Sequence, residues 1–159
     1  MLKRLRERAG SESGFTLIEL LVVMLILGIL AAIAIPAFLN QKGKANDSNA
    51  KTLVRTEQTA METFQTDHNT YTGATCAALN NIDKSIPVAG CTAPVITNVP
   101  TAGSGYTVSV TAANTNNVFR VVRAGDGSIS RTCTLGGTNA GGCTIPAATA
   151  PAAGVNGTW

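Results

Sequence analysis

The sequence predicts an α+β protein in which one long N-terminal helix packs on a small three-stranded antiparallel sheet, followed by a disulfide-stapled, loop-rich C-terminus. Three observations carry this prediction. An apolar segment runs from Phe15 to Leu39, and its only charge is Glu19. Helical spacing of apolar residues then continues to about residue 66. Finally, residues 106–110 alternate between apolar and polar side chains, as half-buried strands do, and two further strand-like segments follow up to Cys133.

Charge and hydropathy divide the chain of 159 residues into four regions. Residues 1–14 form a basic leader, 15–39 a membrane-length helix, 40–70 an amphipathic continuation of that helix, and 71–159 a globular head. The net charge is +3, and the leader holds much of it, so the head has no basic stripe of the kind that nucleic-acid binders carry. Basic residues before the apolar segment favour a cytoplasmic N-terminus and an exported head.

The helix is expected to be about 50 residues long, or roughly 75 Å. Its apolar part alone, roughly 37 Å, is long enough to span a bilayer. Pro36 is expected to kink it, because proline removes a backbone donor and crowds the preceding turn. Beyond residue 40, one face repeats at spacings of three, four and seven and is expected to pack on the sheet: Ala50, Leu53, Val54, Ala60, Met61 and Phe64. The polar residues Glu57, Gln58, Glu62 and Gln65 are expected on the other side.

The head is expected to hold an antiparallel meander at about 106–133, with strands at 106–110, 118–123 and 128–133. Asp126-Gly127 is a favourable hairpin dipeptide between the last two strands. A short helical turn is expected at Cys76-Leu79. After Cys133 the chain is rich in Gly, Ala and Pro, which predicts loop and tail.

All four cysteines lie in the exported part: Cys76, Cys91, Cys133 and Cys143. An even number in an oxidising compartment predicts two disulfides, and four cysteines allow three connectivities. We expect the sequential pairing, which closes two short loops. No cofactor or metal is expected, since no C-x-x-C spacing exists and His68 is the only histidine. With no catalytic constellation either, the sequence does not predict an enzyme.

Residues 1–39 admit two ordinary interpretations. One is a cleaved secretory signal, with Ala32-Ile33-Ala34 as a small-residue cleavage site. The other is a plain single-pass anchor for an exported binding domain. Neither explains Glu19, because a carboxylate inside a membrane-length helix is costly unless a partner neutralises it.

The residues Gly14-Phe15-Thr16-Leu17-Ile18-Glu19-Leu20-Leu21-Val22-Val23 closely resemble the class III signal of type IV pilins and the related pseudopilins. The resemblance implies that a prepilin peptidase cuts after Gly14 and methylates the new amine of Phe15. It also implies that Glu19 pairs with the amine of a neighbouring subunit during assembly. Gly28 and Pro36 bracket a stretch that filaments of this family unwind, and both residues disfavour helix.

The implied function is that of a major pilin precursor, held in the plasma (inner) membrane and then assembled into an extracellular filament. A dedicated motor and platform would extract the subunit, and identical subunits would polymerise for adhesion, twitching motility or DNA uptake. Weak DNA binding by the fibre is a further expectation. A weak positive field around Lys42, Lys44 and Lys51 is conceivable, but a solvated helix face is the better explanation of these lysines. The alternative is a type II secretion pseudopilin, whose C-terminal loop commonly binds calcium. The region after Arg131 contains no Asp or Glu, which disfavours that site.

Overall fold

The computed structural model describes residues 14–89, 91, 95–99, 103–138, 141–147 and 149–159. The predicted leader up to Ser13 lies outside the described residues. The chain forms two compact units, Met1–Leu39 and Asn40–Trp159, which are treated separately below.

The long helix is α2, Leu17–His68, with 52 residues. It begins two residues later than the predicted start at Phe15 and includes both Gly28 and Pro36. Asn69 follows it with a φ of 55°, and its backbone N–H donates to the carbonyl of Gln65 at 2.7 Å. A residue in the left-handed region just past the last turn is a common way to end a helix, and asparagine tolerates it.

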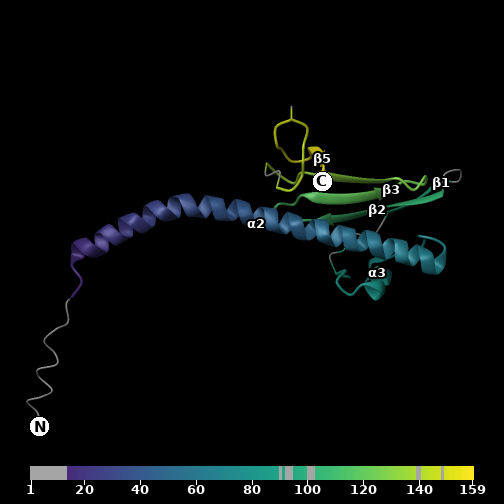
Figure 1. Ribbon diagram of the computed structural model, residues 1–159, viewed down its shortest axis with the longest axis horizontal. Coiled ribbons are helices and arrows are strands. Elements are labelled where there is room, and N and C mark those ends of the chain that lie inside the picture. Colours follow the sequence, from purple (N-terminus) through teal and green to yellow (C-terminus); the bar gives the residue numbers. More distant parts are fainter. Residues whose placement is uncertain (1–13, 90, 92–94, 100–102, 139–140, 148) are drawn as a thin grey trace, which may run out of the picture. The chain divides into compact units, whose positions relative to one another are not determined.

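The sheet has five antiparallel strands in sequential order: β1 (Val95–Val99), β2 (Gly103–Thr111), β3 (Val118–Arg123), β4 (Ile129–Thr134) and β5 (Asn156–Thr158). The predicted meander is confirmed as β2, β3 and β4, but the predicted count of three strands is wrong. One strand is added at each edge, as Figure 1 shows.

The C-terminal segment, predicted as loop and tail, contains β5. Its residues Asn156, Gly157 and Thr158 pair with Thr134, Cys133 and Thr132. On the other side, the backbones of Thr144 and Thr158 exchange two hydrogen bonds of 2.8 Å. A strand this short has almost no periodicity of its own. Its position is decided by the partners on both sides of it.

The core lies between the second half of α2 and one face of the sheet (Figure 1). The expected helix face is largely confirmed, with Val54 and Met61 fully buried and Leu53 half-buried at its margin. From the sheet the core receives Tyr106, Val108, Phe119, Val121 and Cys133. One expectation for the opposite face is wrong: Glu57 is buried, at 1% exposure, among these residues.

A short helix, α3 (Cys76–Ile82), replaces the predicted helical turn. The Thr75 hydroxyl accepts a hydrogen bond from the Ala78 N–H at 3.2 Å and so caps its first turn. Leu79 projects into the core and is fully buried. The Cys76–Cys91 disulfide ties the start of α3 to the segment that leads toward β1.

Candidate processing junction and assembly surface

The predicted cleavage junction lies just outside α2. Gly14 and Phe15 are exposed and have no regular secondary structure, and the Phe15 side chain is 86% exposed. A peptidase needs an extended, reachable segment, because a helical peptide bond is shielded by its own turn. The local structure at this junction meets that requirement.

Thr16 caps the helix directly after the junction. Its hydroxyl oxygen accepts a hydrogen bond from the Glu19 N–H at 3.2 Å, and its carbonyl accepts from the Leu20 N–H at 3.3 Å. Thr16 and Glu19 therefore occupy the two positions of a capping box, Thr-x-x-Glu. A carboxylate in the first turn also interacts favourably with the helix dipole. Sequence reasoning missed this second role of Glu19, although the capping spacing is visible in the sequence.

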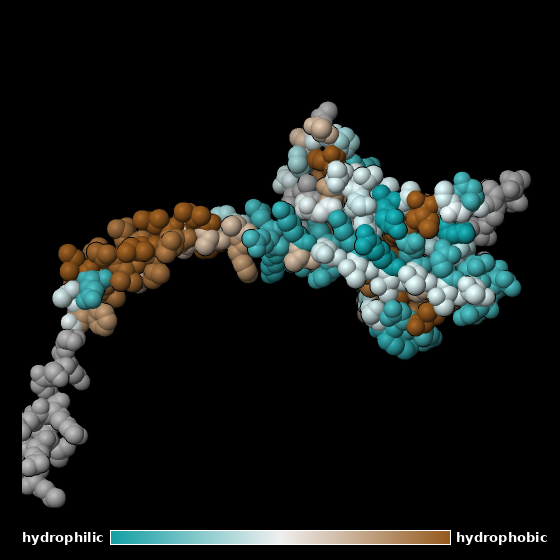
Figure 2. Space-filling view, viewed as in Figure 1, coloured by the Kyte–Doolittle hydropathy of each residue, from teal (hydrophilic) through white to brown (hydrophobic). Residues whose placement is uncertain are grey.

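The first unit exposes an uninterrupted apolar surface. Its large apolar side chains between Phe15 and Leu39 are all between 44% and 86% exposed. Figure 2 shows this surface as a continuous brown region over the N-terminal part of α2. Among the described residues, α2 is the one helix long and apolar enough to cross a membrane. Exposing such a large apolar surface to water is unfavourable, so the surface must be buried against lipid or protein.

Gly28 and Pro36 both lie within α2 on this unit. No atom lies within 4 Å of the place where a side chain on Gly28 would begin, so nothing in the described part of this chain requires a glycine there. The kink at Pro36 and the unwinding between the two residues stay predictions.

In the second unit, Asn40–Trp159, which is called the head from here on, Asp47 is completely buried and joins three segments. Its carboxylate accepts hydrogen bonds from the Thr115 hydroxyl, from Asn117 Nδ2 at 2.9 Å, and from the Gly142 N–H at 2.9 Å. Gly141 has a φ of +52°, and a β-carbon there would overlap Asp47 Oδ2. Gly141 is thus required by the close approach of the loop to this carboxylate.

A second cluster gathers around Glu62, which was expected on the solvent side and is half-buried. Its carboxylate accepts hydrogen bonds from the hydroxyls of Tyr106 at 2.8 Å and Tyr71 at 3.0 Å, and pairs with Arg123 Nε at 3.2 Å. Burial, then the hydrogen bond to Glu62, raises the pKa of Tyr71 to about 12 and that of Tyr106 further. Both tyrosines therefore stay neutral donors at physiological pH.

Glu57 is the one buried carboxyl with an unmet hydrogen-bonding atom among the described residues. In the described part of the chain, no donor lies within hydrogen-bonding distance of its Oε2. Burial raises the pKa of this carboxyl to about 7, well above its ordinary value of 4.5. The helical pattern predicted a charged, solvent-exposed Glu57. With a pKa of about 7, the buried carboxyl instead carries its charge in only about half of the molecules near neutral pH.

The disulfides have the sequential pairing, Cys76–Cys91 and Cys133–Cys143, with sequence separations of 15 and 10. Beside the second one, Trp159 packs edge-on against Phe119 and donates from Nε1 to the Thr132 carbonyl at 2.8 Å. Lys51 lies over both aromatic rings and also donates to the Gly142 carbonyl. Lys51 thus belongs to the packing of the head, whereas Lys42 and Lys44 are exposed.

His68 has a structural environment. Its ring stacks on Phe64 at 4.1 Å, and Nδ1 lies 3.0 Å from the Phe64 carbonyl, which can only accept, so Nδ1 carries the proton. Across the described residues, no three His, Cys, Asp or Glu side chains are placed to hold a metal ion together.

A capped junction, an exposed apolar helix and an α+β head together define a pilin-like subunit. The family described as "Prokaryotic N-terminal methylation motif" matches residues 10–35, which include the junction and Glu19. The chain is similar both to type IV pilins and to core proteins of type II secretion systems.

Three relatives show the range of similarity. The type IV major pilin protein PilA of Myxococcus xanthus is 47% identical over 58 residues, covering 36% of this chain and 26% of the relative. The type IV wide pilus major component PilA4 of Thermus thermophilus is 39% identical over 77 residues, 48% of this chain and 59% of the relative. The type II secretion system core protein G of Aeromonas hydrophila is 38% identical over 60 residues, 38% of this chain and 42% of the relative.

The matched part of this chain thus spans between about a quarter and three fifths of these relatives' lengths. The search of solved structures gave no match.

Proposed function

We propose that this chain is the precursor of a major pilin, a structural subunit that is cleaved after Gly14, methylated on Phe15 and polymerised into an extracellular type IV filament. The observation that carries the proposal is the bare apolar surface of α2, which begins within a turn of the junction. A bilayer can cover that surface before assembly, and a bundle of identical helices can cover it afterwards, so apolar burial is retained throughout.

Cleavage would create a partner for Glu19. The new amine of Phe15 would lie four residues from Glu19, and two copies offset along their axes would bring one amine beside the next carboxylate. Each charge would then compensate the other in a medium of low dielectric constant. Because a head-to-tail contact with a non-closing rotation repeats without end, such pairing favours a filament over a ring.

Cleavage, membrane anchoring and assembly each require a partner. The proposed partners are a prepilin peptidase, the membrane, an assembly platform with its motor, and further copies of the chain. The N-terminus would face the cytoplasm and the head the outside. Adhesion, motility or DNA uptake would then be properties of the fibre, and the chain itself would carry no enzymatic activity.

A pseudopilin of a type II secretion system is the second candidate, favoured by the similarity to the core protein G. The absence of Asp and Glu after Arg131 argues against a calcium loop in the C-terminal segment. Similarity to the two pilins does not separate the candidates, because the core protein G matches a stretch of similar length at 38% identity.

The test is electron microscopy of material sheared from the cell surface, with mass spectrometry of its subunits. Long filaments that contain this chain with methylated Phe15 at the N-terminus are expected. Glu19→Ala should keep processing normal and reduce filament yield sharply, whereas Glu12→Ala, in the part removed by cleavage, should not. Normal filament yield from correctly processed Glu19→Ala would refute the proposed pairing of Glu19 with the Phe15 amine. Finding only monomeric membrane protein would refute the proposal that the chain is a pilin.

A further inference from the structure

The buried carboxyl of Glu57 has no hydrogen-bond donor in the described part of its own subunit. The residue is 1% exposed, and Oε2 meets no donor there. The nearest polar contact of Oε1 is the Cys91 sulfur at 4.0 Å, which is disulfide-bonded and has no proton to donate. Buried polar groups in folded proteins almost always have a partner, so this atom points to one that lies beyond the described residues of its own subunit.

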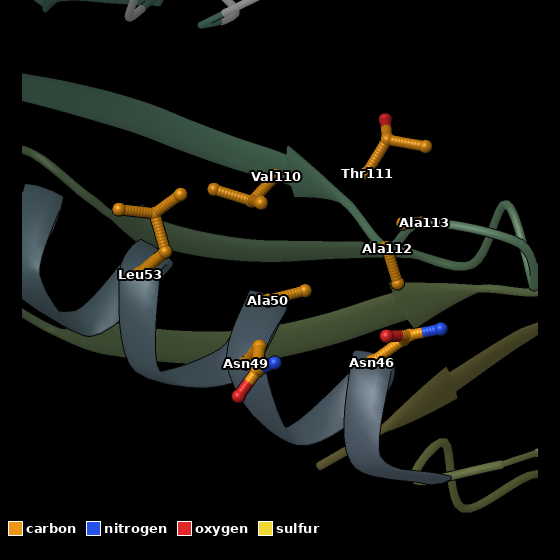
Figure 3. A pocket seen from close by; sticks show the side chains of 8 residues that line it. All are labelled: Asn46, Asn49, Ala50, Leu53, Val110, Thr111, Ala112 and Ala113. Atoms are coloured by element: carbon orange, nitrogen blue, oxygen red, sulfur yellow. The ribbon is translucent and has the colours of Figure 1, made fainter. Parts of the chain in front are cut away.

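Glu57 lines an opening between α2 and β2. A cavity of about 220 Å³ is bounded by Glu57, Leu53, Pro87 and Val110. A second cavity of about 190 Å³ adjoins it and shares Leu53 and Val110 with it. In Figure 3 these two side chains point toward each other across the gap between helix and strand. The two cavities form one groove with a carboxyl at one end, and its walls are largely apolar, with Ser109, Thr111 and Asn49 as polar members.

At the other end of the groove, Asn46 Nδ2 is also buried and meets no acceptor among the described residues. Asn46 and Glu57 are 11 residues apart on α2, or about 16 Å at 1.5 Å per residue. A groove with aliphatic walls and a terminal carboxyl suits a long aliphatic stem with a cationic end, which describes a lysine side chain.

No lysine from the described part of the same subunit fills it. The residues that line the Glu57 cavity include no cation, and Arg123 pairs with the neighbouring carboxylate of Glu62. Lys51 is engaged with Phe119 and Trp159. In the described part of the head, the exposed amines are those of Lys42, Lys44 and Lys84.

Helix geometry distinguishes these lysines. Lys44 precedes Glu57 by 13 residues, which places it about 140° around the helix and about 20 Å nearer the N-terminus. Lys42 precedes Glu57 by 15 residues and lies only about 60° from it. When parallel helices stand side by side, a groove on one faces roughly the opposite side of its neighbour. Lys44 is on that side, and Lys42 is not.

We propose that Lys44 of one subunit enters the α2–β2 groove of a neighbouring copy and pairs there with Glu57. This rests on the proposed function, because parallel helices with an axial offset follow from a filament of membrane-derived subunits. The contact is heterologous: each subunit presents its groove to one neighbour and its lysine to another, so the contact repeats along the fibre. It adds a pairing in the head to the one proposed at Glu19.

The experiment is zero-length cross-linking of sheared filaments with a carbodiimide, which joins a carboxylate to an amine in direct contact. Filaments assembled from a mixture of ¹⁴N- and ¹⁵N-labelled subunits allow mass spectrometry to separate cross-links between subunits from those within one. A mixed-label peptide joining Glu57 to Lys44 is expected. It should disappear in Lys44→Gln and persist in Lys42→Gln, a matched exposed lysine on the same helix.

Two results would overturn the proposal: cross-links at other carboxylates with none at Glu57, or Glu57 joined to Lys42, to Lys84 or to another protein. Glu57→Gln filaments should lack the Glu57 product and keep the others. If wild-type cells make no filaments containing this chain, the proposed function itself fails. If filaments form without the Glu57–Lys44 product, only this inference fails.

Discussion

Replacing Glu57 with glutamine should remove most of the pH dependence of the head's stability near neutrality. Burial raises the pKa of this carboxyl to about 7 in the folded head, against 4.5 without burial. As the pH rises above 4.5, the unfolded chain releases the proton while the folded head holds it until about 7. The free energy of unfolding therefore falls across this window and becomes flat above it.

The size of the effect follows from the same two values. The difference corresponds to a loss of about 3 kcal/mol between pH 4.5 and pH 8, since one pKa unit is worth about 1.36 kcal/mol. Apart from Glu57, no residue that lines its cavity titrates in this range, because Cys91 is in a disulfide. Glutamine has the size of the neutral acid, so Glu57→Gln should resemble wild type at pH 5 and exceed it by about 3 kcal/mol at pH 8.

Urea unfolding of the unassembled full-length chain in detergent micelles measures this directly. Trp159 is the only tryptophan and packs against Phe119 in the head, so its fluorescence reports head unfolding. For a urea dependence of about 1–3 kcal/mol per molar, the variant's midpoint at pH 8 should lie about 1–3 M above that of wild type. Asp67→Asn, an exposed carboxyl near the end of α2, is the control and should leave the pH profile unchanged. Parallel pH profiles for wild type and Glu57→Gln would refute the reasoning.

Three other substitutions test the remaining parts of the structure. Asp47→Ala leaves three donors without their acceptor and should lower head stability by about 3–5 kcal/mol, measured by the same urea unfolding. Replacing Cys133 and Cys143 together by alanine opens a loop of about 10 residues and should cost about 2–3 kcal/mol in that assay. Gly14→Leu should leave uncut precursor, seen by mass spectrometry as a chain heavier by the mass of the leader.

The Asp47 and Gly14 substitutions each have a matched control, and all three substitutions have a contrary outcome. Asp67→Ala removes an exposed carboxylate near the end of α2 and should leave the urea midpoint close to that of wild type. If Asp47→Ala matches it, the buried cluster does not stabilise the head. If the double cysteine variant unfolds at the wild-type midpoint, the Cys133–Cys143 disulfide does not stabilise the head. Gly10→Leu should be processed normally, and equal processing of Gly14→Leu would exclude this junction as the cleavage site.

Residue types and their spacing were enough to predict the long helix, the central meander and the four cysteines as two disulfides. They sufficed because each signal is local. An apolar run with helical periodicity has few stable forms other than a helix. The strand-like segments within 106–133 are short, and the Asp126-Gly127 turn joins the last two of them into a hairpin within a few residues. The Gly14-Phe15 junction with Glu19 is equally local, and these neighbouring residues are sufficient to indicate the family.

The edge strands and the buried acids could not be predicted in this way. β5 is three residues long and depends on pairing with β4 and Thr144. Asp47 and Glu57 are charged, so a pattern assigns both to solvent. Only the tertiary structure supplies the donors that make the burial of Asp47 favourable, from Asn117 and Gly142, which are 70 and 95 residues away.

The sequence by itself thus determined the class of protein, the helix and the junction, because those depend on the order of neighbouring residues. The tertiary structure decided which carboxyls lie inside the head and which of them meets no donor among the described residues. Burial and hydrogen bonding are properties of segments brought together from distant positions, and no local spacing records them. Asp47 has its donors within the head, whereas Glu57 Oε2 has none among the described residues, and that difference is the reason to look for its partner in a neighbouring subunit.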